Sequence, residues 1–202
     1  MPRLVLASAS PARLALLRAA GLDPSVQVSG VDESVVKTDD AAELCLTLAR
    51  MKAQAVAADL PKEEGTLILG CDSVLAFDGE ILGKPSGEDD AKARWRAMRG
   101  RAGVLHTGHH LIDQGSGQNA EAVGSTIVHF ADVSDAEIEA YVATGEPLYV
   151  AGAFTIDGRG GFFVERIEGD HGNVVGLSLP LLRRLLMKFE VSVGQLWGKS
   201  TS

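Results

Sequence analysis

The chain has 202 residues, of which 46% are hydrophobic and 5% aromatic, so it is long enough for one domain with a mainly aliphatic core. The formal net charge is −8 and no cluster of Lys and Arg runs along the chain, which argues against general nucleic-acid binding. Cys45 and Cys71 are too few and too far apart for a disulfide framework or a CxxC metal site. No apolar run approaches the roughly 18 residues that cross a bilayer. We therefore expect a soluble, cytoplasmic protein with reduced thiols.

The first predicted elements form a strand that runs directly into a helix. The apolar segment 4–7 predicts the strand, and the helix over 11–20 follows, with Ser10 at the N-cap and Pro11 at the first helical position. Such a junction exposes backbone N–H groups at the positive end of a helix dipole, which suits a phosphate. Arg13 lies in the first turn, where a cation is unfavourable unless an anion is near. The alternative interpretation is an ordinary strand–helix junction with a surface arginine.

The rest of the chain alternates between strand and helix patterns. We predict strands over 26–29, 66–71, 74–77, 80–82, 106–113, 122–131 and 162–167, and helices over 41–58, 88–98, 134–143 and 180–189. Because hairpins interrupt the strand–helix units, the fold class is α/β with a mixed sheet. We expect one domain over 1–190, either as a single body or as two lobes around a cleft. A C-terminal tail over 191–202 follows it, and its last residues, 198–202, are expected to fray.

Two acidic residues follow predicted strands. Glu33 comes after the segment 26–29, and Asp72 comes directly after the buried strand 66–71. A carboxylate at the C-terminal end of a central strand is well placed to face a ligand, although Asp72 could simply start a turn. Both side chains offer the hard oxygen ligands that suit Mg²⁺ or Mn²⁺.

Two lysines are candidates for phosphate binding. Pro85 favours an extended conformation at Lys84, and Gly83 permits close backbone approach. Lys52 borders the buried stripe of the helix predicted over 41–58. The alternative for Lys84 is a solvated lysine in a turn. The alternative for Lys52 is a lysine whose aliphatic stem covers apolar surface. The five histidines form no metal-binding pattern, so we interpret them as structural or surface residues.

Taken together, these segments resemble the Maf-like family of nucleoside triphosphate pyrophosphatases. The matching segments follow the family order from about residue 4 to about residue 186, which makes coincidence improbable. They are 8–17, 31–33, 52–53, 71–74, 82–85, Arg101 with 107–108, 141–147, 151–154 and 173–177.

The resemblance implies a Maf-type fold around a long curved mixed sheet with a ligand cleft, often in a homodimer. It also implies hydrolysis of a nucleoside triphosphate to the monophosphate and pyrophosphate with a divalent metal cation. By resemblance, Asp72 is the proton acceptor, and the phosphate and metal site is lined by Ser8, Arg13, Glu33, Lys52 and Lys84. The chemistry agrees, because Asp72 and Glu33 can share an ion while the cationic side chains and Ser10 hold phosphate oxygens.

Several positions depart from the family pattern. Ala12, Ser73 and Asp157 stand where many members have arginine, threonine and glutamine, and Val150 and Gly103 replace a lysine and a histidine. The pattern of the members that prefer dTTP or UTP is therefore incomplete. An ionised Asp157 only accepts hydrogen bonds, so it would favour a base edge that presents N–H groups, such as a guanine-type edge. The alternative is a loop aspartate with no contact to the base.

Three functions follow from this reading. The leading one is a hydrolase that clears non-canonical, modified or surplus nucleotides, which the presence of Asp72, Glu33 and Lys84 together favours. The second is a nucleotide-binding regulator of cell division with little catalysis. This alternative stays open because Ala12 and Val150 replace an arginine and a lysine of the family pattern. The third is a metal-dependent phosphatase, which would release orthophosphate in place of pyrophosphate.

Overall fold

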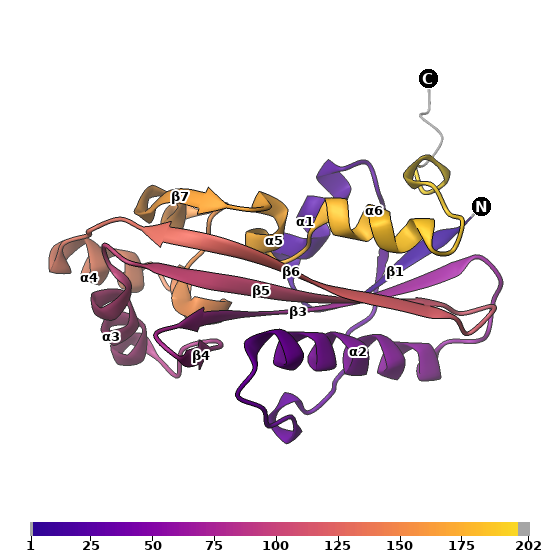
Figure 1. Ribbon diagram of the computed structural model, residues 1–202, viewed down its shortest axis with the longest axis horizontal. Helices are drawn as coiled ribbons and strands as arrows, with labels where there is room; N and C mark the ends of the chain where they lie inside the picture. The colour runs from indigo at the N-terminus through magenta and orange to yellow at the C-terminus, as the bar shows by residue number, and fades with distance from the viewer. Residues whose placement is uncertain (1, 198–202) are drawn as a thin grey trace.

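The computed structural model describes residues 2–197 and is built on a seven-stranded mixed sheet with the order β2-β1-β3-β5-β6-β7, to which β4 adds by pairing with β3 (Figure 1). The strands are β1 (Arg3–Ala7), β2 (Ser25–Val26), β3 (Thr66–Phe77), β4 (Glu80–Leu82), β5 (Ala102–Asp113), β6 (Asn119–Phe130) and β7 (Val164–Glu168). The helices are α1 (Pro11–Ala19), α2 (Ala41–Asp59), α3 (Glu88–Met98), α4 (Asp135–Ala143), α5 (His171–Val175) and α6 (Leu179–Met187). The expected α/β class with a mixed sheet is confirmed.

Three long strands, β3, β5 and β6, run the length of the molecule, and helices cover both faces of the sheet (Figure 1). β1 pairs with β3 in parallel, whereas β5 pairs with β3 antiparallel over the segment 67–76. The helix α2 covers one face, and α1, α5 and α6 cover the other (Figure 1). β3 is buried on both faces over most of its length, which explains its nearly continuous apolar sequence.

The helix α2 packs unusually close to β3 and β5. Four of its buried residues are small and recur every four positions, as a stripe made of Ala41, Cys45, Ala49 and Ala53. Glycines face this stripe from the sheet. A β-carbon on Gly70 would collide with the backbone carbonyl of Ala49, and one on Gly108 would collide with the backbone of Cys45. The small side chains on α2, together with the absence of side chains at Gly70 and Gly108, therefore set the depth at which α2 lies on the sheet.

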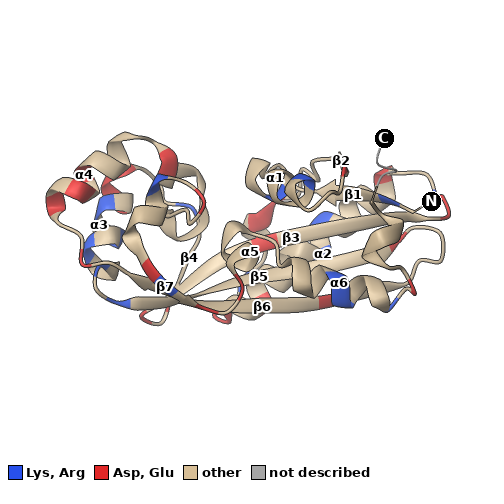
Figure 2. Cartoon of the chain, turned by 90° about the horizontal axis from the view of Figure 1, so that it is seen from above, with Lys and Arg blue, Asp and Glu red and all other residues tan. Residues whose placement is uncertain are grey.

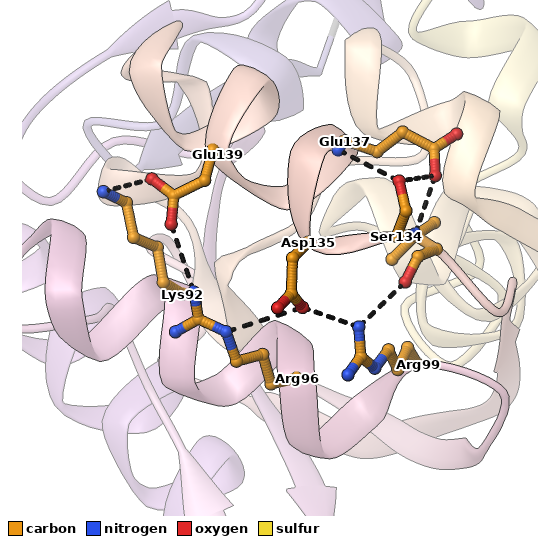
Figure 3. A network of polar contacts seen from close by, with 8 residues as sticks. Lys92, Arg96, Arg99, Ser134, Asp135, Glu137 and Glu139 are labelled. Carbon is orange, nitrogen blue, oxygen red and sulfur yellow. Dashed lines mark hydrogen bonds and ion pairs between the residues drawn. The ribbon is translucent and has the colours of Figure 1, made fainter.

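The core is divided between two ends of the molecule. Figure 2 shows α3 and α4 grouped at one end, and α1, α2, α5 and α6 at the other. At the first end the fully buried Trp95 makes edge-to-face contacts with Phe130 and Tyr141, with ring centroids 5.7 and 5.6 Å apart. On its outer surface α3 is tied to α4 by ion pairs, among them Arg96 and Lys92 to Glu139 (Figure 3). The long strands connect the two ends.

The structure corrects several predicted elements. The segments 66–71 and 74–77 are one continuous strand, β3, so Asp72 lies inside a strand and does not start a turn. The strand predicted over 162–167 begins only at Val164, after a 3₁₀ helix over Arg159–Phe163. The strand predicted over 26–29 is Ser25–Val26, and the glycine-flanked segment 169–177 contains α5.

The predicted domain ends at residue 190, but residues beyond it also pack against the core. Val191, Val193 and Leu196 pack against the core cluster beneath α6, and the indole N–H of Trp197 donates to the carbonyl of Ala20 at 3.0 Å. The segment 191–197 is thus attached to the domain, whereas 198–202 lie outside the described residues. Within 2–197, no helix combines the length and hydropathy needed to cross a membrane.

The close packing of α2 predicts a large effect of Gly70→Ala. The added methyl group meets backbone that cannot move without displacing α2, so the free energy of unfolding should fall by about 3 kcal/mol. Urea denaturation checks this. As a control, Gly87→Ala adds a methyl group where no atom lies within 4 Å and should cost less than about 1 kcal/mol. Equal stability of the two variants would contradict the proposed packing constraint.

Candidate active site

The candidate site lies along a short stretch of β3 that has no strand beside it on one edge. β1 pairs with β3 up to Gly70, and β4 pairs with it from Leu75 onward. β5 occupies the opposite edge, so β1 and β4 lie on the same edge. Among the described residues, no strand therefore pairs with this edge over 71–74. Because β1 is parallel to β3 and β4 is antiparallel, both strands end pointing toward this stretch.

Successive side chains in this stretch face opposite sides of the sheet. Asp72 lies on the same face as Gly70, toward α2, and its carboxylate contacts Lys52. Ser73 lies on the opposite face, where its hydroxyl contacts Arg13. A ligand at the open edge could therefore reach groups from both faces.

On the α2 face, one lysine joins two carboxylates. Nζ of Lys52 lies 2.5 Å from Oδ1 of Asp72 and 2.7 Å from Oε1 of Glu33. The side chains of Lys52 and Asp72 are each 12% exposed, whereas Glu33, at the start of a 3₁₀ helix over Glu33–Val35, is 53% exposed. Oδ2 of Asp72 makes no hydrogen bond within 2–197. The predicted convergence of Lys52, Asp72 and Glu33 is therefore present in the structure.

The surroundings of Asp72 act on its protonation in opposite directions. Burial raises the pKa of the Asp72 carboxyl, the positive charges of Lys52 and Arg13 lower it, and Glu33 raises it. The net result is a pKa above the ordinary value of an aspartate. Lys52 and Arg13 therefore oppose the effect of burial on the Asp72 carboxyl but do not cancel it.

On the opposite face, Arg13 is buried and fixed by the protein at three of its donors. Nε donates to the carbonyl of Gly176 at 2.7 Å, and the two terminal nitrogens donate to the hydroxyls of Ser8 and Ser73, each at 3.0 Å. A guanidinium has five N–H donors, so two remain for an anion. The interpretation of Arg13 as a plain surface arginine is wrong, because the residue is 8% exposed.

The α1 junction has the predicted cap. The hydroxyl of Ser10 accepts a hydrogen bond from the backbone N–H of Arg13 at 3.4 Å, and the hydroxyl of Ser8 accepts one from the N–H of Ser10 at 3.2 Å. These contacts place Ser8, Ser10 and the first turn of α1 where β1 ends. The positive end of the helix therefore lies at the open edge of β3.

A chain of hydrogen bonds behind Ser73 was not anticipated from the sequence. The hydroxyls of Ser73 and Thr107 lie 2.8 Å apart, and that of Thr107 donates to the carbonyl of Asn173 at 2.9 Å. Thr107 and Asn173 belong to segments that carry the family resemblance, yet only the fold shows that they support Arg13 through Ser73.

Lys84 is exposed and lies in the turn that follows β4. If the register of β4 against β3 is continued by two residues, Lys84 comes level with Ser73. The side chain has no ion-pair partner among the described residues. The turn itself is anchored, because the carbonyl of Gly83 accepts a hydrogen bond from the N–H of Gly152 at 3.1 Å.

Other singled-out residues lie outside this group of contacts. Asp157 is exposed in the loop after Phe154, Ala12 and Val150 are partly buried, and Arg101 pairs with Asp78 at the β3–β4 hairpin. The structural interpretation of the histidines holds for His109. Its ring contacts the carbonyl of Thr107 at 3.0 Å and accepts from the N–H of Ser178 at 2.8 Å, and burial lowers its pKa to about 4.

The carboxylates of Asp72 and Glu33 share one cation, the ammonium group of Lys52. Within 2–197 no group of three or more His, Cys, Asp and Glu side chains is arranged to hold a metal ion. Mg²⁺ is commonly bound by one or two carboxylates together with substrate phosphates and water. Asp72 and Glu33 are the residues that could hold such an ion, because both offer hard carboxylate oxygen atoms and lie beside the same ammonium group.

Comparisons with known proteins show which family the chain resembles. The model of the Maf-like protein family matches residues 3–189. A nucleoside triphosphate pyrophosphatase of Salinispora tropica is 65% identical, covering 99% of this chain and 89% of its own length. Proteins with the same name from Streptomyces coelicolor and Microcystis aeruginosa are 60% and 53% identical over 96% of this chain, and over 94% and 98% of their own lengths.

The family match covers the candidate site and nearly all of the described chain, and it confirms the resemblance carried by the motifs. On this basis, the chain belongs to the Maf-like protein family.

Proposed function

We propose that this protein is a nucleoside triphosphate pyrophosphatase, a hydrolase acting on acid anhydrides that forms the nucleoside monophosphate and pyrophosphate. The observation that carries the proposal is the cluster of Lys52, Asp72 and Glu33 beside the open edge of β3, with Arg13 on the other face. The names of the Salinispora and Streptomyces relatives support the same activity.

The chemistry follows from the contacts of each residue. Attack of water on the α-phosphorus requires a base for the water proton and positive charge beside the phosphate oxygens. Asp72 supplies the base at Oδ2, because Oδ1 is already held by Lys52. Arg13 has two free donors for phosphate oxygens, and its other contacts fix its plane. Lys52, Lys84, Ser8 and Ser10 complete the phosphate site.

A divalent cation, Mg²⁺ or Mn²⁺, is part of this proposal. Glu33 and Asp72 would hold it, and when bound it would neutralise charge on the phosphate oxygens. Lys52 keeps the two carboxylates together when the substrate is absent. Without the ammonium group between them, the two negative charges would repel one another. The site thus maintains its acidic pair without depending on the ion for its shape.

Base selection is proposed to involve Asp157. Its loop is fixed by Glu146, whose carboxylate accepts hydrogen bonds from the hydroxyl of Thr155 at 2.5 Å and from the N–H groups of Arg159 and Gly160 at 3.0 and 2.9 Å. Burial acts to raise the pKa of Glu146, but these hydrogen bonds outweigh it and lower the pKa. The backbone around Asp157 is therefore fixed while its carboxylate is exposed and available as an acceptor.

Product analysis tests the activity. The protein is incubated with a panel of nucleoside triphosphates and Mg²⁺ or Mn²⁺, and the phosphorus products are identified by NMR. We expect monophosphate and pyrophosphate in equal amounts, no turnover in EDTA, and at least about a 100-fold lower kcat in Asp72→Asn. Asp78→Asn, at an exposed hairpin position, is the matched control and should retain activity.

The melting temperature of Asp72→Asn should stay within about 3 °C of the parent, because the replaced carboxylate is costly to bury. Orthophosphate as the product would point to a phosphatase, and nucleotide binding without turnover to a regulator. Full activity of Asp72→Asn would remove its assigned role as proton acceptor.

The role of Asp157 predicts a change in base preference. The parent should have a higher kcat/KM for triphosphates with a guanine-type edge than for dTTP or UTP, and Asp157→Gln should reduce that ratio about tenfold. Glu165→Gln, an exposed substitution on β7, is the control and should leave the ratio unchanged. A preference for dTTP or UTP that Asp157→Gln does not alter would contradict the assignment.

A further inference from the structure

Two residues of α3 hold the backbone on either side of Lys84. Arg94 forms a two-pronged ion pair with Asp90, in which Nε and one terminal nitrogen each donate to a carboxylate oxygen at 2.9 Å. The other terminal nitrogen of Arg94 donates to the carbonyl of Gly83 at 2.7 Å. The residue immediately before Lys84 is thus fixed by Arg94.

Asp90 fixes the chain on the other side. Its Oδ2 accepts hydrogen bonds from the backbone N–H of Ser86 at 2.8 Å and from the Ser86 hydroxyl at 3.2 Å. Gly83 and Ser86 flank the dipeptide Lys84-Pro85, and Pro85 itself is buried. The pair of Asp90 and Arg94, spaced by one helical turn, therefore clamps both ends of the turn.

This clamp matters because Lys84 has no ion-pair partner of its own among the described residues. An exposed lysine has four rotatable bonds, and nothing in the turn orients its side chain. The place of its ammonium group therefore depends on where the backbone of the turn is held. The clamp comes from the α3 end of the molecule, whereas Arg13 and Lys52 come from the other end (Figure 2).

We propose that Asp90 and Arg94 are positioning residues that hold the turn of Lys84 at the open edge of β3, so that the ammonium group meets the phosphates of the substrate. The inference rests on the proposed function, because it acts through a phosphate-binding Lys84. No motif used for the family resemblance contains either residue.

The test measures kcat and KM for pyrophosphate release in four variants, namely Lys84→Met, Arg94→Met, the double variant and Arg96→Met. Arg96→Met is the matched control, since Arg96 lies on the same helix but pairs with Glu139 and Asp135 of α4 (Figure 3). Lys84→Met should lower kcat/KM about 100-fold, Arg94→Met should lower it about tenfold, and Arg96→Met should leave it unchanged.

Two results distinguish positioning from a general structural role. Arg94→Met should change the same parameter, kcat or KM, as Lys84→Met does. It should also have less than about a twofold effect when Lys84 is already methionine, because it acts through that side chain. If Arg94→Met unfolds, Asp90→Asn replaces it, as it keeps the side-chain shape and removes the charge that binds Arg94.

Normal activity of Arg94→Met, or a full tenfold effect in the Lys84→Met background, would overturn the inference. If Lys84→Met itself is fully active while Asp72→Asn is inactive, the inference fails and the proposed pyrophosphatase activity stands. If no variant and no parent releases pyrophosphate, the proposed function fails first.

Discussion

The site depends on how closely α2 lies against β3. Small residues on the helix and Gly70 and Gly108 on the sheet permit backbone contact, and this depth lets a lysine on α2 reach a carboxylate on β3 at 2.5 Å. A longer side chain at either surface would lift the helix and separate Lys52 from Asp72. The close packing of α2 on the sheet is therefore also what holds the charged groups of the site in contact.

Burying this cluster of charges is unfavourable for folding. The proposed function gives a reason for its presence. A carboxylate with little exposure loses hydration, and its attraction to Lys52 offsets only part of that loss. Arg13 on the other face is similarly removed from water but is held by uncharged oxygen atoms, which leaves its positive charge available to a ligand. A polyphosphate anion with a divalent cation would balance both groups at once.

Local patterns in the sequence predicted most elements and the capped start of α1. They failed where long-range pairing decides the structure. Asp72 was expected at a strand end, because a polar residue after an apolar run is typical of one, but pairing with β5 carries β3 through it. The clamp of Asp90 and Arg94 is not predicted from the sequence, because its contact with Gly83 joins a helix to a turn that precedes it. Homodimer formation and cytoplasmic location stay predictions.

Lys52 opposes the effect of burial on Asp72, and an NMR titration of the Asp72 side-chain carboxyl carbon in the parent and in Lys52→Met measures this opposition. Lys37→Met, on an exposed loop, is the control. Removing the ammonium group should raise the pKa of Asp72 further, because burial would then act with less opposition, whereas Lys37→Met should leave it unchanged. The same pKa in the parent and in Lys52→Met would contradict the account.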